Sequence, residues 1–176
     1  MVQSVAPLQG ATNMTEFRKN LVALSLCACA LIAGSTAAAQ PVKQGEENIT
    51  HVYTYVDKVM KQGDRSVIFR ELSGVSRNDK GSGMLHNLGL RCWGFIDVVE
   101  DKPSTTGRCV EVDADGDQVF ATYVNKAGVG SHTLVGGTGK YAGISGEQTF
   151  SGVTPVKGPD GLNVLIVSLH TTWKLP

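Results

Sequence analysis

The sequence contains neither a long hydrophobic run nor an excess of charge of either sign. Its main apolar stretch, Leu21 to Gly34, is shorter than the ~20 residues that a transmembrane helix needs. Lysine and arginine together number 16, as do aspartate and glutamate, so the formal net charge is +0. We therefore expect no membrane span in the mature chain and no nucleic-acid partner, since nothing attracts polyanions electrostatically.

Complete cofactor and nucleophile motifs are also lacking. The glycine-dense segment 136–146 resembles a phosphate-binding loop, but Leu134 and Tyr141 stand where that loop requires a glycine and a hydroxyl residue. Its glycine spacing does not fit a dinucleotide fingerprint, and no helical pattern follows it. We therefore expect a structural turn and no cofactor. The glycines that let this turn adopt positive φ angles are Gly136, Gly137, Gly139 and Gly143.

The amino-terminal segment has the pattern of a secretory signal peptide. Two basic residues precede the apolar stretch, and the small residues 36–39 follow it. This pattern predicts a leader over residues 1–39 with cleavage near Ala39/Gln40. The mature protein is then expected to be secreted or periplasmic.

The remaining length is enough for one domain. We expect a flexible lead-in over residues 40–48, which are mostly polar, and a single domain over 49–176. Met14 directly precedes the signal-peptide pattern, so either Met1 or Met14 is the start of the chain. Neither alternative changes the domain.

Cysteine is scarce, with 4 in the whole sequence. Cys27 and Cys29 lie in the predicted leader, which leaves Cys92 and Cys109 in the mature chain. In an oxidising compartment, two cysteines on strand-like segments are most simply a disulfide. We expect no metal site, because no histidine pair accompanies the two thiols.

Short β-patterned segments recur along the mature chain and are separated by clusters of turn residues. Only 56–62 has a pattern that allows a helical turn. Even spacing without a long amphipathic helix favours an all-β domain, and glycine-rich strands favour a barrel over a sandwich. The expected strands are 49–56, 66–76, 84–99, 105–112, 118–125, 131–135, 143–153 and 162–173.

The segment between the two cysteines predicts a hairpin with a definite register. If Cys92 pairs directly with Cys109, then Leu90 lies opposite Glu111 and Trp93 lies opposite Arg108. The second pair allows a cation–π contact of ~0.5–1 kcal/mol across the strands.

Several motifs together resemble those of a known family. The sequence is similar to bacterial allene oxide cyclase barrel-like proteins, and plant dirigent proteins have a similar Gly-Gly-Thr-Gly turn. The resemblance implies an eight-stranded antiparallel β-barrel, often a homodimer or homotrimer, whose cavity holds a small apolar molecule in some relatives. The matching segments are 136–143, Leu85-His86-Asn87, Arg91-Cys92, Gly107-Arg108-Cys109, 113–117 and Trp173-Lys174-Leu175-Pro176.

Two sets of candidate site residues follow from strand parity, which does not decide between them. His86 shares a strand face with Cys92, and that face reaches Glu111 across the hairpin. If it points inward, His86 and Glu111 are candidate catalytic groups with shifted pKa values. If it points outward, Arg91, Trp93 and Arg108 line the cavity and are candidate ligand-binding residues.

The alternating acids Asp113, Asp115 and Asp117 resemble the start of a calcium loop. Gly116 is one position too early for that loop, and Asn125 stands where a bidentate glutamate is required. A solvated hairpin turn is therefore the favoured interpretation. Arg70 and Glu71 are interpreted as surface charges.

These patterns predict a small secreted barrel that binds an apolar or aromatic ligand or serves as a structural module. The alternative is a cofactor-free cyclase, isomerase or stereo-directing protein. Self-association is also expected, because the last predicted strand carries apolar residues on both faces, Leu165 and Val167 on one and Val164 and Ile166 on the other.

Overall fold

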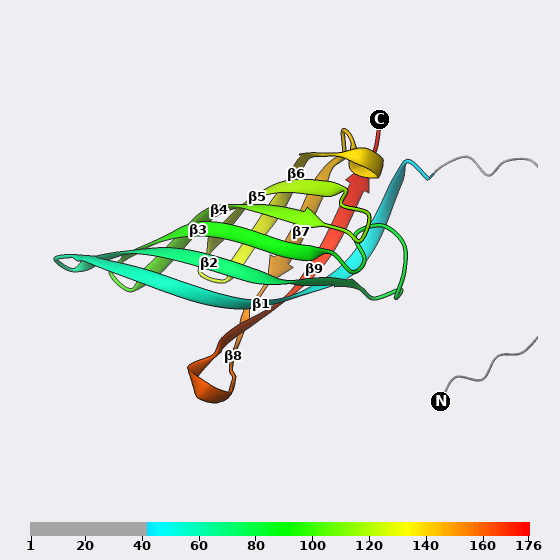
Figure 1. Cartoon of the computed structure of the whole chain (residues 1–176). Helices are drawn as coiled ribbons and strands as arrows, with labels where there is room; N and C mark the ends of the chain where they lie inside the picture. Colours follow the sequence, from blue (N-terminus) through cyan, green and yellow to red (C-terminus); the bar gives the residue numbers. More distant parts are fainter. Residues whose placement is uncertain (1–41) are drawn as a thin grey trace, which may run out of the picture. The chain divides into compact units, whose positions relative to one another are not determined.

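The computed structural model describes residues 42–176, so the predicted leader, its cleavage point and the choice of start codon lie outside the described residues. The described chain is almost entirely β-structure (Figure 1). Its elements are β1 (Gln44–Gln62), β2 (Arg65–Asn78), β3 (Gly89–Val99), β4 (Lys102–Val112), β5 (Gln118–Lys126), β6 (Val129–Gly137), η1 (Gly139–Tyr141), β7 (Ser145–Ser151), β8 (Thr154–Lys157), η2 (Pro159–Gly161) and β9 (Asn163–Lys174).

The sheet closes on itself. Each strand from β1 to β6 pairs antiparallel with the next, and β9 pairs with both β7 and β1. The short β8 pairs with the other end of β9 and follows β7 after Gly152, whose φ is +103°. β7 and β8 therefore occupy one position in the wall, and the predicted eight-stranded antiparallel barrel is confirmed.

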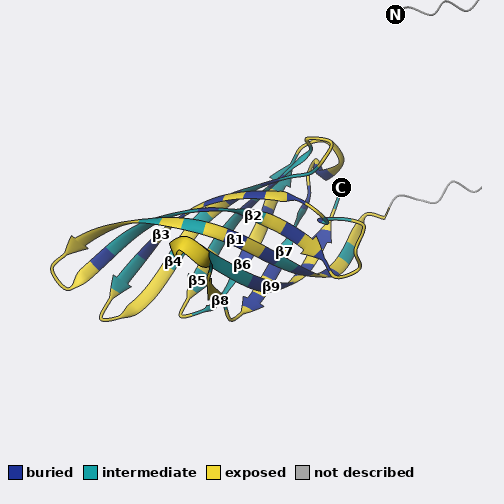
Figure 2. Ribbon diagram, turned by 60° about the horizontal axis from the view of Figure 1, so that its bottom comes forward, coloured by how far each residue is buried: buried dark blue, intermediate teal, exposed yellow. Residues whose placement is uncertain are grey.

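Side chains alternate between the barrel interior and solvent along the strands of the barrel wall, as pleating requires, whereas β8 and the last residues of β1 are exposed throughout. In β3 every second residue from Leu90 to Ile96 is buried, while those between them are exposed. Figure 2 shows this alternation along the strands and the exposed hairpin tips at one end. The face that carries Leu90 and Cys92 is therefore the inner one, and the face that carries Arg91 and Trp93 is the outer one. Strand parity in the sequence had left this choice open.

The hairpin of β3 and β4 has the predicted register. Cys92 lies opposite Cys109, Leu90 opposite Glu111, and Trp93 opposite Arg108. The two cysteines form the expected disulfide, with their Cα atoms 4.1 Å apart.

Two predictions about the first strand were wrong. Residues 56–62 continue β1 and pair with β2, so they form no helical turn. β1 also begins at Gln44, well inside the lead-in predicted over 40–48, because residues 44–48 pair with the last strand. The polar residues 44–48 give no local strand pattern, and the strand that they pair with is more than a hundred residues away in the sequence.

The two ends of the barrel differ. One end, which we call the mouth, carries the β1–β2, β3–β4 and β5–β6 hairpins. The other, the closed end, carries the β2–β3 loop, the β4–β5 turn and the glycine-rich turn. Loop residues Leu85 and Leu88 and turn residues Tyr141 and Ile144 are buried in the core there.

The glycine-rich turn is fixed to the acidic turn at the closed end. The Lys140 ammonium lies 2.7 Å from Asp113 and 2.8 Å from Asp115, and the Lys140 backbone N–H donates to Asp117. Gly139 has a φ of +51°, and a Cβ there would stand 1.7 Å from an Asp117 oxygen. Lys140 of the segment that resembles a phosphate-binding loop thus binds carboxylates of its own chain.

Candidate functional site

A half-open cavity of about 80 Å³ extends from the mouth into the barrel. Its apolar walls come from β2, β3, β7 and β9, and the disulfide forms part of its lining. The polar or charged side chains in this lining are Tyr53, Arg70, Thr105, Tyr123, Asn125 and His132.

Tyr123 lies in a slot formed by two glycines. Gly94 and Gly107 are directly opposite each other on β3 and β4. A Cβ on Gly94 would stand 2.1 Å from the Tyr123 hydroxyl oxygen, and one on Gly107 would stand 2.3 Å from its ring. Burial raises the pKa of Tyr123 to about 12, so the phenol keeps its proton. No described residue hydrogen-bonds to this hydroxyl, which leaves it free to bind a ligand.

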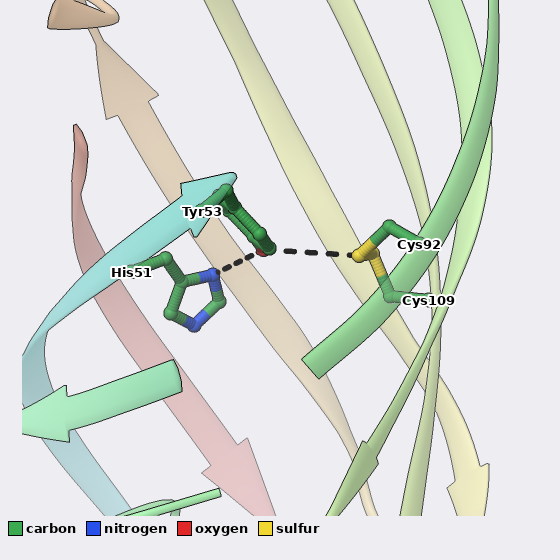
Figure 3. Close-up of a disulfide and its surroundings, with 4 residues drawn as sticks. All are labelled: His51, Tyr53, Cys92 and Cys109. Carbon is green, nitrogen blue, oxygen red and sulfur yellow. Dashed lines mark hydrogen bonds between the residues drawn. A yellow bond between two sulfur atoms is a disulfide. The ribbon is translucent and has the colours of Figure 1, made fainter. Parts of the chain in front are cut away.

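Tyr53 and His51 form a second polar pair, next to the disulfide (Figure 3). The Tyr53 hydroxyl oxygen is 2.8 Å from His51 Nδ1 and 3.8 Å from Cys92 Sγ. Burial is the main cause that lowers the pKa of His51 and raises the pKa of Tyr53. Both groups are therefore neutral near pH 7, and the hydrogen bond joins a phenol to an uncharged imidazole.

Several buried polar side chains lie inside the barrel. We call His51, Glu111, His132, Gln148 and Thr171 the polar layer. Gln148 on β7 lies opposite His132 on β6 and opposite Thr171 on β9. The ring centroids of His51 and His132 are 5.7 Å apart. Several atoms of the layer have no hydrogen-bond partner among the described residues. They are His51 Nε2, both Glu111 carboxyl oxygens, His132 Nδ1, the Gln148 amide atoms and Thr171 Oγ1.

Glu111 and His132 are the layer's proton-exchanging groups. Burial raises the pKa of Glu111 to about 7 and lowers the pKa of His132 to about 4. Near neutral pH, Glu111 can therefore both donate and accept a proton, while His132 is an uncharged imidazole. Buried groups with such shifts are typical of sites that carry out acid–base chemistry.

The two predicted catalytic candidates lie in different places. Glu111 is fully buried inside the barrel. His86 lies in the β2–β3 loop, where its Nδ1 accepts a hydrogen bond from the Asn78 backbone N–H. The parity argument failed for His86 because β3 begins only at Gly89, and Leu85 and Asn87 have positive φ angles.

The predicted ligand-binding residues Arg91, Trp93 and Arg108 lie on the outer face, away from the cavity. Trp93 is 40% exposed, and its indole N–H donates to Glu71, which also pairs with Arg91. The guanidinium over the Trp93 ring is that of Arg91, 5.7 Å from the ring centroid, where the sequence had suggested Arg108.

The interpretation of Arg70 as a surface charge was wrong, because its side chain lines the cavity. Its guanidinium makes two hydrogen bonds of 2.7 Å to Asp57 and lies 4.0 Å from the centroid of the Tyr55 ring.

The sequence did not identify Tyr53, Tyr123, His132 and Gln148 as site residues, and its patterns favoured ordinary strand residues for the histidine and the two tyrosines. A signal for them existed. Each of them lies two positions from a small, apolar or histidine residue and therefore shares the inner face of its strand. A polar side chain on a largely apolar strand face is the pattern that could have identified them.

The sequence and the structure were compared with known proteins. No protein-family model matches the sequence, and no curated protein matches it significantly. Among solved structures, the pterocarpan synthase dirigent protein GePTS1 matches with a TM-score of 0.46 and 10% identity, over 77% of this chain and 88% of that one. Pyocyanin demethylase matches with a TM-score of 0.39 and 20% identity, over 71% and 99%.

Among residues 42–176, no helix has the length and apolar character needed to cross a membrane.

Proposed function

We propose that the barrel binds a small, largely apolar molecule that carries a hydrogen-bond acceptor such as a carbonyl or ether oxygen. The observation that carries this proposal is Tyr123, which lines a half-open cavity with apolar walls and whose hydroxyl makes no hydrogen bond to another described residue. Binding sites of this kind combine apolar walls with a few placed polar groups that orient the ligand.

The cavity volume limits how the ligand enters. At about 80 Å³ it is smaller than the roughly 150 Å³ cavity that holds benzene in an engineered protein core. A flat ring or the end of an acyl chain would therefore enter from the mouth, with the rest of the molecule near Arg70 and Asn125. This geometry favours thin or planar ligands over bulky ones.

The test is native mass spectrometry of the purified protein, soaked with phenolic and lipid extracts and then denatured to release bound molecules. We expect an adduct that Tyr123→Phe weakens by about tenfold, the effect of losing one hydrogen bond to a buried ligand. Tyr141→Phe, at the closed end, is the matched control and should bind as the wild type does. A barrel that stays empty in every extract would contradict binding and favour a structural module.

A second candidate function, a cofactor-free isomerase or cyclase, is favoured by the buried and unpartnered Glu111 carboxyl. Glu111 does not line the cavity, so in such a reaction the ligand would reach past that lining, and Glu111 would take a proton from one ligand carbon or oxygen and return it to another. The measurement is deuterium incorporation from D₂O into the bound molecule. Incorporation lost in Glu111→Gln while binding persists would support the enzyme, and its absence in the wild type would exclude this role for Glu111.

We further propose that the protein works in a secretory or periplasmic compartment. The disulfide between Cys92 and Cys109 supports this, because such bonds persist in oxidising surroundings. Amino-terminal sequencing of the protein from its own cells tests the proposal, and the expected first residue is Gln40 or a close neighbour.

A further inference from the structure

One stretch of β1 has a free edge. β1 pairs with β9 only as far as Thr54 opposite Val164, but it pairs with β2 as far as Gln62 opposite Arg65. Residues 55–62 thus have no second strand partner within 42–176. Figure 1 shows the β1–β2 hairpin projecting past the other strands. An edge strand of this kind presents unpaired backbone N–H and C=O groups that can pair with another strand.

Exposed apolar side chains gather on this edge. Val56 is 64% exposed, Val59 57% and Met60 54%. Edges that do not associate are usually protected by charged side chains, especially lysine, or by proline, a bulge or a covering loop. Residues 55–62 have neither a proline nor a break in their pairing with β2, but they contain Lys58 and Lys61. This edge can therefore associate only in a pairing that compensates these charges.

We propose that two copies of the chain associate by antiparallel pairing of this edge about a two-fold axis. In an antiparallel pair, opposite residues both direct their backbone groups toward the partner strand or both direct them away. Two identical edges can therefore pair only in registers where the residue numbers of opposite residues have an even sum. Only a few such registers place most of residues 55–62 opposite one another.

The charges select one register. When Val59 lies opposite the second Val59, Asp57 lies opposite Lys61 at two equivalent places, and opposite charges on directly facing residues stabilise a strand pair. Asp57 already pairs with Arg70 of its own chain, so Lys61 of the second copy would join an existing ion pair. Neighbouring registers place Lys58 opposite Lys58, Asp57 opposite Asp57 or Lys61 opposite Lys61, which is repulsive. The register centred on Met60 brings no opposite charges together. The Val59-centred pairing is therefore the self-complementary one.

Cross-linking tests this register directly. A carbodiimide joins a carboxylate and an amine only when they touch. Asp57 and Lys61 of one strand are about 13 Å apart, at ~3.3 Å per residue, and cannot react with each other. In a mixture of isotopically light and heavy protein, we expect a mixed Asp57–Lys61 cross-link. Its absence, when other cross-links form, would overturn the register.

Two lysine variants provide a matched test of the interface by sedimentation over a dilution series. Lys61→Asp and Lys58→Asp change the charge equally, but only Lys61→Asp places an acid opposite Asp57. We expect Lys61→Asp to raise the dimer dissociation constant about tenfold, and Lys58→Asp, which lies opposite Met60, to change it less than about twofold. Equal effects, a monomer at every concentration, or a trimer would overturn the proposal.

A second pair of variants covers the case in which Lys61→Asp does not fold. Val59→Lys places two lysines opposite each other at the two-fold axis, while Val75→Lys adds the same charge at an exposed position of β2 that is paired on both sides. We expect only Val59→Lys to give a monomer. Dimers of equal strength in both variants would contradict the proposed edge.

Discussion

Glu111 and Asp113 lie two residues apart in the sequence, yet their carboxyl groups are in opposite situations. Glu111 has no hydrogen-bond partner among the described residues, and burial raises its pKa to about 7. Asp113 pairs with Lys140 and accepts backbone N–H groups of Asp115 and Asp117, so its pKa is lowered, chiefly by the lysine. The chemical group is the same, and the surroundings alone set its charge.

This contrast separates a structural carboxylate from a candidate functional one. The Asp113 side chain is only 7% exposed, but its charge has a cation and two N–H donors to compensate for lost water. Glu111 lacks such compensation. A buried carboxylate without partners lowers the stability of the fold unless water or a ligand hydrogen-bonds to it or a proton neutralises it. The unsatisfied carboxyl points to function, and the satisfied one stabilises the fold.

The largest expected effect comes from Glu111→Gln. Since the pKa of Glu111 is raised from 4.5 to about 7 on folding, the folded state holds a proton in that window that the unfolded state has lost. This group's contribution to the free energy of unfolding is thus highest below pH 4.5 and falls by about 3 kcal/mol as pH rises to 7, at ~1.4 kcal/mol per unit. In Glu111→Gln the free energy of unfolding should not show this decrease between pH 4.5 and 7.

The measurement is urea unfolding of both proteins between pH 4.5 and 8. The difference between them should grow in favour of the variant as pH rises, because the titrations of His51 and His132 cancel in the comparison. Parallel stability curves would show that Glu111 is not buried without a partner.

The next effect concerns the glycine-rich turn. Gly139→Ala places a Cβ at a φ of +51° and against Asp117, which should lower the free energy of unfolding by about 1–2 kcal/mol. Gly116→Ala is the matched control, since its φ of +87° is also unfavourable but a Cβ there meets open space. Thermal unfolding of both should show the larger loss at Gly139. Equal losses would mean that the Asp117 contact contributes nothing.

The smallest effect is expected for Lys140→Met, which removes the cation beside Asp113. The pKa of Asp113 should then rise toward its ordinary value, and the stability that its lowered pKa provides above pH 4 should diminish. Lys102→Met is the control, because Lys102 and Glu100 are both exposed and 3.5 Å apart. NMR titration of the Asp113 carboxyl measures the shift, and an unchanged titration would contradict the role given to Lys140.

The sequence was sufficient for the barrel's local parts. Alternation and turn residues predicted the strands, two cysteines on strand-like segments predicted the disulfide, and direct pairing of Cys92 with Cys109 predicted the hairpin register. The prediction failed where pairing partners are remote, as at residues 44–48, and where loop geometry interrupts a strand pattern, as at His86.

The sequence by itself determined which residues share a strand face, because side-chain alternation is a local property of the backbone. Only the tertiary structure decided which face is inside, since closure of β1 on β9 defines the interior. The same closure brings His51 of β1 to the ring of His132 on β6 and surrounds Glu111 with core residues that exclude water. Burial, which shifts the pKa values of these groups, is thus a property of the closed barrel and of no single segment.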